Sequence, residues 1–282
     1  MKVLAVGAAG TSAGLVTRAL AAQGVEVRGL VHSAAREAAA RANGATETVV
    51  ADLDSREELA AALDGVDAVF HVVPAFVPDE AATGLVMVEA ARKAGVRRLV
   101  FSSVYHPSLL TLSNHRDKQP VEQAIYDSGL EFTVLQPAMF MSQLDGIAAS
   151  AIEHGVIAGP YSSESKMAYV DYRDVAEAAA QALTTDRLLG GTFELAGAGE
   201  YSRHEIAREL SSLLGRPLRA EGAEPAELDP RMPAHLREGL ATMFHHYEVA
   251  GLRGGNSLVL DTILQRPAAT VPTYLRELVA RA

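Results

Sequence analysis

The chain has 282 residues, a formal net charge of −10 and no cysteine. This length predicts a main domain with a smaller appendage, and a composition that is 49% apolar predicts a packed interior. The acidic balance argues against a nucleic-acid partner, which would need clustered Lys and Arg, and the lack of cysteine excludes disulfides, thiolate nucleophiles and cysteine-based zinc sites. Met1 and Lys2 lead straight into a short apolar strand, and no run approaches the roughly 20 apolar residues of a membrane-spanning helix. We therefore expect a cytoplasmic protein with no signal peptide and no membrane partner.

Short β-branched runs alternate with longer helical patterns through the first half of the chain. The expected strands are Val3–Val6, Val25–Val31, Thr46–Val50, Ala68–Val73, Leu99–Ser102 and Phe132–Leu135. The expected helices include Ser12–Ala22, Ser55–Leu63, Ala81–Ala94 and Pro120–Asp127, and Gly24, Gly65, Gly95 and Gly129 are placed to end several of the helical segments. Because the strands are apolar on both sides and separated by helices, the pattern predicts a doubly wound parallel sheet of Rossmann type.

After Pro137 the pattern changes to helices with isolated strands. The expected elements are the strands Tyr169–Val170 and Thr192–Leu195 and the helices Arg173–Leu183, Ser202–Leu214, Ala234–Val249 and Thr273–Arg281. Prolines 225, 230 and 233 interrupt the stretch that begins near Leu218. We expect a dinucleotide-binding core in residues 1–137 with further elements from about 165–200, and a mainly helical substrate-side segment in 138–282 with a candidate lid at 218–250.

The segment Val6-Gly7-Ala8-Ala9-Gly10-Thr11-Ser12-Ala13-Gly14 follows the first strand and opens the first helix. In that context glycines let the backbone approach a pyrophosphate, and a small Ala13 lets the helix pack on the strand. The turn therefore predicts a dinucleotide site. The alternative is a tight strand-to-helix turn that binds no ligand.

The end of the second strand distinguishes NADP from NAD. Proteins of this architecture that prefer NAD carry Asp or Glu there, but this chain has none; it offers His32, Ser33 and Arg36 to a 2′-phosphate instead. NADP(H) is therefore favoured, with NAD(H) as a further option. Alternatively, Arg36 belongs to a solvated helix face and His32 merely ends a strand. Asp52, after the third strand, either accepts from the adenine amino group or caps the following turn.

Four segments resemble the atypical short-chain dehydrogenases/reductases and, among them, the NmrA-like family of NAD(P)-binding proteins. They are the turn at Gly7, Gly10 and Ala13, then Phe101-Ser102-Ser103, then 128–137, and then Tyr169-Val170-Asp171-Tyr172-Arg173-Asp174-Val175-Ala176. The resemblance implies an active-site cleft at the carboxyl ends of the strands. It also implies a cofactor-binding set of Gly7, Ala9, Gly10, Thr11, Ser12, Ala13, His32, Ser33, Arg36, Asp52, Val73, Pro74, Lys118 and Pro137.

In the parent superfamily a Ser, a Tyr and a Lys four residues after the Tyr reduce carbonyls. By the resemblance, the serine maps to Ser102 or Ser103 and the lysine to Lys118, which leaves Asn114 at the tyrosine position. The usual general acid is therefore missing. The candidate groups for stabilising an oxyanion are Ser103, Tyr105, Asn114 and His115, with Tyr105 preferred to His106.

The absence of the usual tyrosine leaves two classes of function. The first is an NADPH-dependent reductase of a carbonyl or quinone on a small apolar molecule, including hydroxy-aromatic ketones of polyketide type, in which a phenol on the substrate polarises the carbonyl. Met139 and Phe140, with Met243 and Tyr247, are the candidate substrate residues, although such side chains also fill ordinary cores. The second class is a non-catalytic NADP(H) sensor that binds a protein partner. The choice between a monomer and a homodimer stays open.

Other chemistries have less support in the sequence. His245 and His246 are adjacent, so they point in different directions on a helix, and no carboxylate lies at ligand spacing; we expect no metal. There is no Gly-x-Ser-x-Gly elbow for a hydrolase, and the turn at Gly7 lacks the Gly-Lys-Ser/Thr ending of an ATPase loop. A sugar-nucleotide epimerase would use the same cofactor site but would rely on the missing tyrosine.

Overall fold

The computed structural model describes residues 1–222 and 228–281. The chain divides into two compact units, which are described separately: unit 1 comprises Met1–Gln136 and Val175–Glu194, and unit 2 comprises Pro137–Asp174 and Leu195–Ala282. Pro225 and its neighbours in the expected lid lie outside the described residues. No helix in the described part of the chain is long and apolar enough to cross a membrane.

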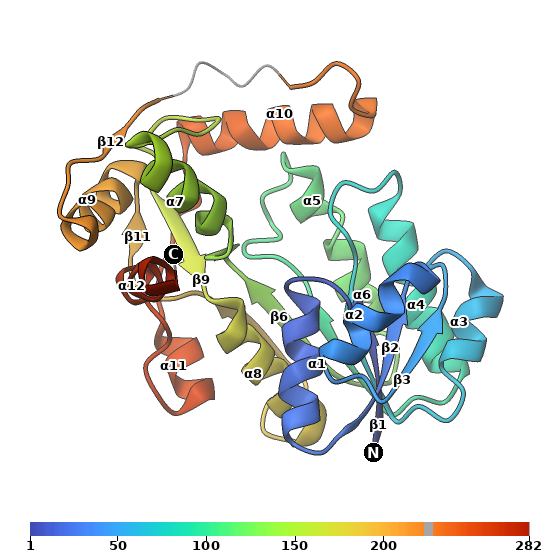
Figure 1. Ribbon diagram of the computed structural model, residues 1–282. Helices are drawn as coiled ribbons and strands as arrows, with labels where there is room; N and C mark the ends of the chain where they lie inside the picture. The colour runs from blue at the N-terminus through green and yellow to red at the C-terminus, as the bar shows by residue number, and fades with distance from the viewer. Residues whose placement is uncertain (223–227, 282) are drawn as a thin grey trace. The chain divides into compact units, whose positions relative to one another are not determined.

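Unit 1 is built on a seven-stranded sheet with the order β10-β6-β5-β4-β1-β2-β3 (Figure 1). The strands are β1 (Lys2–Val6), β2 (Glu26–Val31), β3 (Glu47–Val50), β4 (Ala68–Val72), β5 (Arg98–Ser102), β6 (Glu131–Pro137) and β10 (Gly191–Leu195). The pairings from β6 through to β3 are all parallel. The strand order reverses direction between β1 and β4, and in open parallel sheets a ligand binds at such a point.

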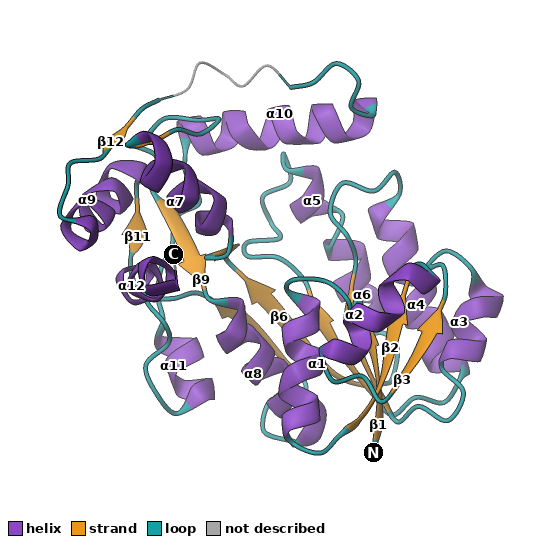
Figure 2. Cartoon of the chain, in the orientation of Figure 1, coloured by secondary structure: helices purple, strands orange, loops and turns teal. Residues whose placement is uncertain are grey.

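Helices connect these strands, as parallel pairing requires (Figure 2). They are α1 (Ala13–Ala22), α2 (Glu37–Ala42), α3 (Arg56–Ala62), α4 (Glu80–Lys93), α5 (Ser113–Arg116) and α6 (Gln119–Tyr126), with a 3₁₀ turn, η1, at Ala34–Arg36. The helix α8 (Tyr172–Thr184) belongs to unit 1 from Val175 onward. Arg98, a buried residue of β5, holds the end of α8 by donating to Thr185 O at 2.6 Å and to Ala182 O at 3.1 Å.

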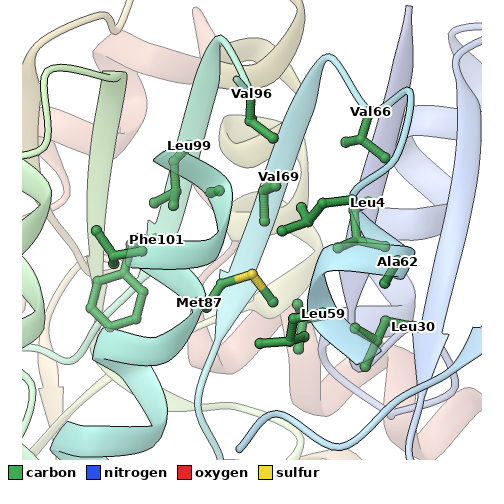
Figure 3. Close-up of a cluster of buried hydrophobic side chains, with 14 of the residues drawn as sticks. Leu4, Leu30, Leu59, Ala62, Val66, Val69, Met87, Val96, Leu99 and Phe101 are labelled. Atoms are coloured by element: carbon green, nitrogen blue, oxygen red, sulfur yellow. The ribbon is translucent and has the colours of Figure 1, made fainter. Parts of the chain in front are cut away.

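The main core lies between the sheet and one layer of helices. Leu4, Val69 and Leu99 from neighbouring strands meet Leu59 of α3 and Met87 of α4, all without exposed surface (Figure 3). Fully burying side chains of this size contributes about 1.5–3 kcal/mol each. This cluster fixes α3, α4 and α6 against the sheet, and so it positions the loops at the carboxyl ends of the strands.

Unit 2 is smaller in its sheets and richer in helices. Its strands are β7 (Met139–Phe140), β8 (Val156–Ile157), β9 (Met167–Val170), β11 (Glu200–Tyr201) and β12 (Arg219–Ala220), arranged as sheets β11-β9-β7 and β12-β8. Its helices are α7 (Gln143–His154), α9 (Arg203–Leu214), α10 (Ala234–Val249), α11 (Leu258–Leu264) and α12 (Val271–Arg281). Asp174 joins two parts of this unit by accepting from Arg266 Nη2 at 2.8 Å and from the Ala269 amide at 2.7 Å.

The structure confirms the predicted doubly wound α/β fold with a smaller, mainly helical segment. The helix α10 has the predicted bounds, and most predicted strands agree to within one or two residues at each end. Of the two later strands, β10 joins the main sheet and β9 lies in the small sheet of unit 2. The sequence reasoning missed α2, α7 and α11, along with the two-residue strands.

Candidate functional site

The turn between β1 and α1 is shaped by two glycines. Gly7 has a φ of 72°, a conformation that side chains disfavour, and its amide donates to Leu30 O at 3.1 Å. The Gly10 amide then donates to Gly7 O at 2.8 Å. Ser12 stands at the N-cap of α1 but makes no side-chain cap hydrogen bond. The Gly14 and Leu15 amides donate instead to Gly10 O at 3.0 Å and to Ser12 O at 2.9 Å, so a phosphate at this turn would be bound by the other amides and by the helix dipole.

Close packing explains why small residues surround the turn. A Cβ built on Gly7 would lie 3.3 Å from Ala13 Cβ, so both positions need to be small. On the other side, Asn43 donates from Nδ2 to Ala8 O at 2.8 Å and lies directly against Gly14. Asn43 was not predicted from the sequence, because it lies 35 residues from Ala8 in the chain.

A pocket of about 500 Å³ opens beside this turn. Its walls come from the turn itself, the end of β2, the loop after β3 and the loop after β4, all in unit 1. Six of the residues expected to bind a cofactor line it, namely Gly7, Ala9, His32, Arg36, Asp52 and Pro74. Gly10, Thr11, Ser12, Ala13, Ser33 and Val73 are their immediate chain neighbours or continue the same turn. A pocket of this kind, walled largely by apolar side chains and bordered by a glycine turn that leads into a helix, fits a dinucleotide.

Arg36 lies over the glycine turn. Its Nη2 donates to Ala9 O at 2.9 Å, and the side chain is exposed on its outer side. The segment from Leu30 to Arg36 contains no carboxylate, so a phosphate on the nucleotide ribose would meet this guanidinium without an opposing charge from that segment. The contact with Ala9 places Arg36 at the pocket rather than on a remote helix face.

Asp52 caps the turn that follows β3. Its Oδ1 accepts from the Asp54 amide at 3.0 Å, as the alternative interpretation of this residue required. Asp54 in turn accepts from Thr83 Oγ1 at 2.6 Å. Because all three residues line the pocket, the cap also rigidifies one of its walls.

Lys118 is buried beside the pocket wall, with 4% of its surface exposed. Its Nζ lies 2.6 Å from Glu80 Oε1 and donates to Val73 O at 3.0 Å. Burial lowers the pKa of Lys118 and raises that of Glu80, and the attraction between the two opposes both shifts. Sequence reasoning identified Lys118 through its spacing, but it missed Glu80, which the sequence shows only as a residue of a helix start.

Ser103 is held by a polar cluster at the end of β5. Its hydroxyl donates to Glu122 Oε1 at 2.5 Å, and Gln136 Nε2 donates to the same carboxylate at 2.9 and 3.1 Å. The Tyr126 hydroxyl reaches Glu122 Oε2 at 3.3 Å. Ser102, the other candidate serine, is 2% exposed in β5. Glu122 was also missed, because its partners come from β5 and β6.

The other catalytic candidates lie in the segment between β5 and α6. The Tyr105 ring packs on His106 with centroids 3.8 Å apart, and His115 Nδ1 lies 3.1 Å from His106 O. His106 Nδ1 in turn lies 2.6 Å from Glu194 Oε1. Asn114 Oδ1 is buried and has no hydrogen-bond partner among the described residues. The structure therefore brings Tyr105 and His115 each into contact with His106, and leaves the oxygen of Asn114 to accept from another group.

The four candidate substrate residues lie in unit 2. The two aromatic residues among them, Phe140 and Tyr247, each make a separate ring contact. Phe140, in β7 beside Met139, meets Tyr172 edge-on at 4.6 Å. Tyr247, one turn after Met243 in α10, meets Tyr161 edge-on at 5.5 Å. These contacts give each ring a packing role within its unit, and a role in binding substrate stays a prediction.

The fold and the glycine turn are those of a Rossmann-type dinucleotide-binding protein. The model of the NmrA-like family matches residues 1–275, and the chain belongs to that family. Among known proteins, an NAD(P)H azoreductase of Xenophilus azovorans is 31% identical over 97% of this chain and 96% of its own length. Quinone oxidoreductase 2 of Escherichia coli (strain K12) is 26% identical over 87% of each chain.

Solved structures agree with this fold. A crystal structure of an NADPH-dependent quinone oxidoreductase from Escherichia coli, complexed with NADPH, superposes with a TM-score of 0.84 at 24% identity, covering 99% of this chain and 100% of the other. The Citrobacter triphenylmethane reductase complexed with NADP(H) superposes with a TM-score of 0.84 at 20% identity over the same shares of the two chains. At these identities the superpositions establish the fold alone.

Proposed function

We propose that this protein is an NADPH-dependent reductase of quinones and related conjugated aromatic compounds. The observation that carries the proposal is the pocket beside the glycine turn, which is lined by Gly7 and Ala9 of that turn and by Arg36. The 31% identical relative named as an NAD(P)H azoreductase and the 26% identical quinone oxidoreductase support it.

The residues that would hold the cofactor follow from the pocket. The Gly7 and Gly10 amides donate within the protein, so the other amides of the Gly7–Ala13 turn would bind the pyrophosphate, because the helix N-terminus attracts negative charge. Arg36, with Ser33 and His32, would bind the 2′-phosphate, which favours NADP(H) while leaving NAD(H) acceptable. When bound, the cofactor supplies the hydride.

The missing tyrosine favours acceptors that need little help from a general acid. A quinone that has gained a hydride is a phenolate, a weak base whose charge is delocalised over the ring, and it takes its proton from water. A simple ketone gives an alkoxide, a strong base that needs a donor in place. A hydroxy-aromatic ketone is intermediate, because its own phenol can donate. Asn114 at the tyrosine position is a neutral amide that cannot act as a general acid, so it fits quinones and hydroxy-aromatic ketones better than aliphatic ketones.

The test is a two-stage assay on purified protein. Binding of NADPH and NADH is titrated first, and NADPH oxidation is then followed against a panel of quinones, azo compounds, hydroxy-aromatic ketones and aliphatic ketones. We expect turnover with quinones and none with aliphatic ketones. Tight binding without turnover of any panel member would instead favour a redox sensor that acts on a protein partner, and absence of binding would contradict the cofactor site itself.

A further inference from the structure

Glu80 makes two contacts that the proposed cofactor site does not explain. It is the first residue of α4 and is 2% exposed. Its Oε2 accepts from the Phe76 amide at 2.9 Å, while its Oε1 lies 2.6 Å from Lys118 Nζ. One buried carboxylate thus holds both a backbone amide of the β4–α4 loop and a side chain from the start of α6.

The loop that Glu80 holds is a wall of the pocket. Pro74, Val77 and Pro78 all line it. Between them, Phe76 has a φ of 60°, which a bulky residue adopts only when its surroundings impose it. The hydrogen bond from the Phe76 amide to Glu80 is the contact that stabilises this backbone conformation.

Lys118 contacts both Glu80 and the start of the same loop. It donates to Val73 O at 3.0 Å, at the start of the same loop, and its ammonium faces Glu80. An ammonium has three donors, and these two contacts are the ones formed with the residues that the structure describes. The third N–H would remain for the dinucleotide that the proposed function assumes.

We propose that Glu80 is a positioning residue, which sets Lys118 and the Val73–Pro78 loop together for the dinucleotide by forming an ion pair with the Lys118 ammonium while it accepts from the Phe76 amide. The inference rests on the proposed function, since it takes the pocket to be a dinucleotide site. It adds a residue that acts through Lys118 and the pocket wall and touches neither cofactor nor substrate. Loss of its charge changes the protonation of Lys118, and loss of its side chain frees the loop.

The charges around Lys118 determine which way its pKa changes when Glu80 is replaced. The groups that face Lys118 are Glu80 from α4, Asp117 from the preceding residue, His71 from β4 and the ring of Phe101 at 6.0 Å. Burial lowers the pKa of Lys118, and the charge of Glu80 is the largest influence that raises it again. Without that charge the ammonium is lost at a lower pH. NADPH is anionic, so its affinity falls when Lys118 loses its charge. Without the charge of Glu80, this fall begins at a lower pH.

Two variants separate the two contacts. Glu80→Gln removes the charge and keeps an oxygen for the Phe76 amide, whereas Glu80→Ala removes both contacts. Glu89→Gln is the matched control, because Glu89 lies on the same helix, is 37% exposed and pairs with Arg56 and Lys93 at the surface. The measurements are hydrogen exchange of the 73–79 segment in the cofactor-free protein, and NADPH dissociation constants between about pH 7 and pH 10.

In Glu80→Ala we expect the Phe76 amide to exchange at least about tenfold faster than in the wild type, with Glu80→Gln close to the wild type. In Glu80→Gln we expect the pH at which NADPH affinity falls to be about one unit lower or more, with Glu89→Gln unchanged. Unchanged exchange in Glu80→Ala, or a pH curve in Glu80→Gln that coincides with the wild type, overturns the proposal. Failure of the wild type to bind NADPH contradicts the proposed function instead, and the exchange measurement then still decides whether Glu80 holds the loop.

Discussion

The Ser103 hydroxyl donates to Glu122 Oε1 across 2.5 Å, and so the serine predicted to assist the reaction is also a partner in a buried polar cluster. Gln136 shares the same carboxylate from β6. The cluster links the end of β5, which Ser103 follows, with Gln136 of β6 and with the helix α6, which Lys118 precedes. Substitutions here should therefore affect stability as well as any activity.

The Ser103–Glu122 contact can be measured by a double-mutant cycle. We expect Ser103→Ala to lower the free energy of unfolding by about 1.5–2 kcal/mol, and Glu122→Ala to lower it by about 2–3 kcal/mol, because the latter leaves Gln136 and Ser103 buried without their acceptor. The coupling energy between the two positions should be about 1.5 kcal/mol or more, as for hydrogen bonds to charged groups. Urea denaturation of the four proteins gives each value. Strictly additive effects would show that the bond contributes nothing to the folded state.

Arg36 should determine the preference for NADPH. Replacing it with Ala is expected to raise the dissociation constant of NADPH about tenfold or more, because a charge-assisted hydrogen bond is worth about 1.5–3 kcal/mol, while NADH, which lacks the 2′-phosphate, changes little. The matched control is Arg41→Ala, since Arg41 is an exposed residue of the next helix that contacts Thr48 and Glu37. Equal effects on both nucleotides would place Arg36 outside the phosphate site.

The elements that could be predicted from the sequence are those that a short stretch of residues encodes by itself. The strands β1 to β6 and the Gly7 turn are encoded in short stretches, by apolar runs and by glycines next to a helix start, and they were predicted. The helix α7 was missed because its sequence mixes Gly146 with several alanines and carries little periodic pattern. The short strands of unit 2 have two residues each, too few for any period to show.

The candidate site shows the same limit. The family resemblance predicted Lys118, and either Ser102 or Ser103, from their positions along the chain, and their roles stay predictions. Glu80 and Glu122 could not be found in that way, because each owes its role to partners that only the folded sheet brings near. Glu80 follows Asp79, which caps α4, so in the sequence it resembles an ordinary acidic residue of a first helical turn.

Gly7 should be required for the turn for two separable reasons. Alanine there would carry an unfavourable φ of 72° and would also place a Cβ 3.3 Å from Ala13 Cβ. Gly24 provides the control, because it has a φ of 73° with nothing near the built Cβ. We expect Gly24→Ala to lower the free energy of unfolding by about 1–2 kcal/mol with NADPH affinity unchanged. Gly7→Ala should lose at least as much stability and also weaken NADPH binding, as isothermal titration would show. Unchanged affinity in Gly7→Ala would mean that the cofactor does not lie on this turn.

His71 should make the protein sensitive to acid. It lies in β4 with no exposed surface, and burial lowers the pKa of its imidazole from 6.5 to about 3, with the charge of Lys118 adding to the effect. Above pH 6.5 the side chain is neutral in both the folded and the unfolded chain, so it has no influence on the pH dependence there. As the pH falls below 6.5, the unfolded chain takes up a proton that the folded chain excludes, which lowers the free energy of unfolding by about 1.4 kcal/mol per pH unit until the folded pKa is reached.

The variant His71→Leu removes this titration while keeping a side chain of similar size in the core. Between about pH 6.5 and pH 4 the wild type should lose roughly 3 kcal/mol more stability than the variant, as measured by urea unfolding at each pH. His154→Leu, at an exposed position near the end of α7, should follow the wild type. If wild type and His71→Leu lost stability in parallel over this range, the buried imidazole would have to be protonated in the folded protein, and its environment could not be the dry one that the packing against Phe101 indicates.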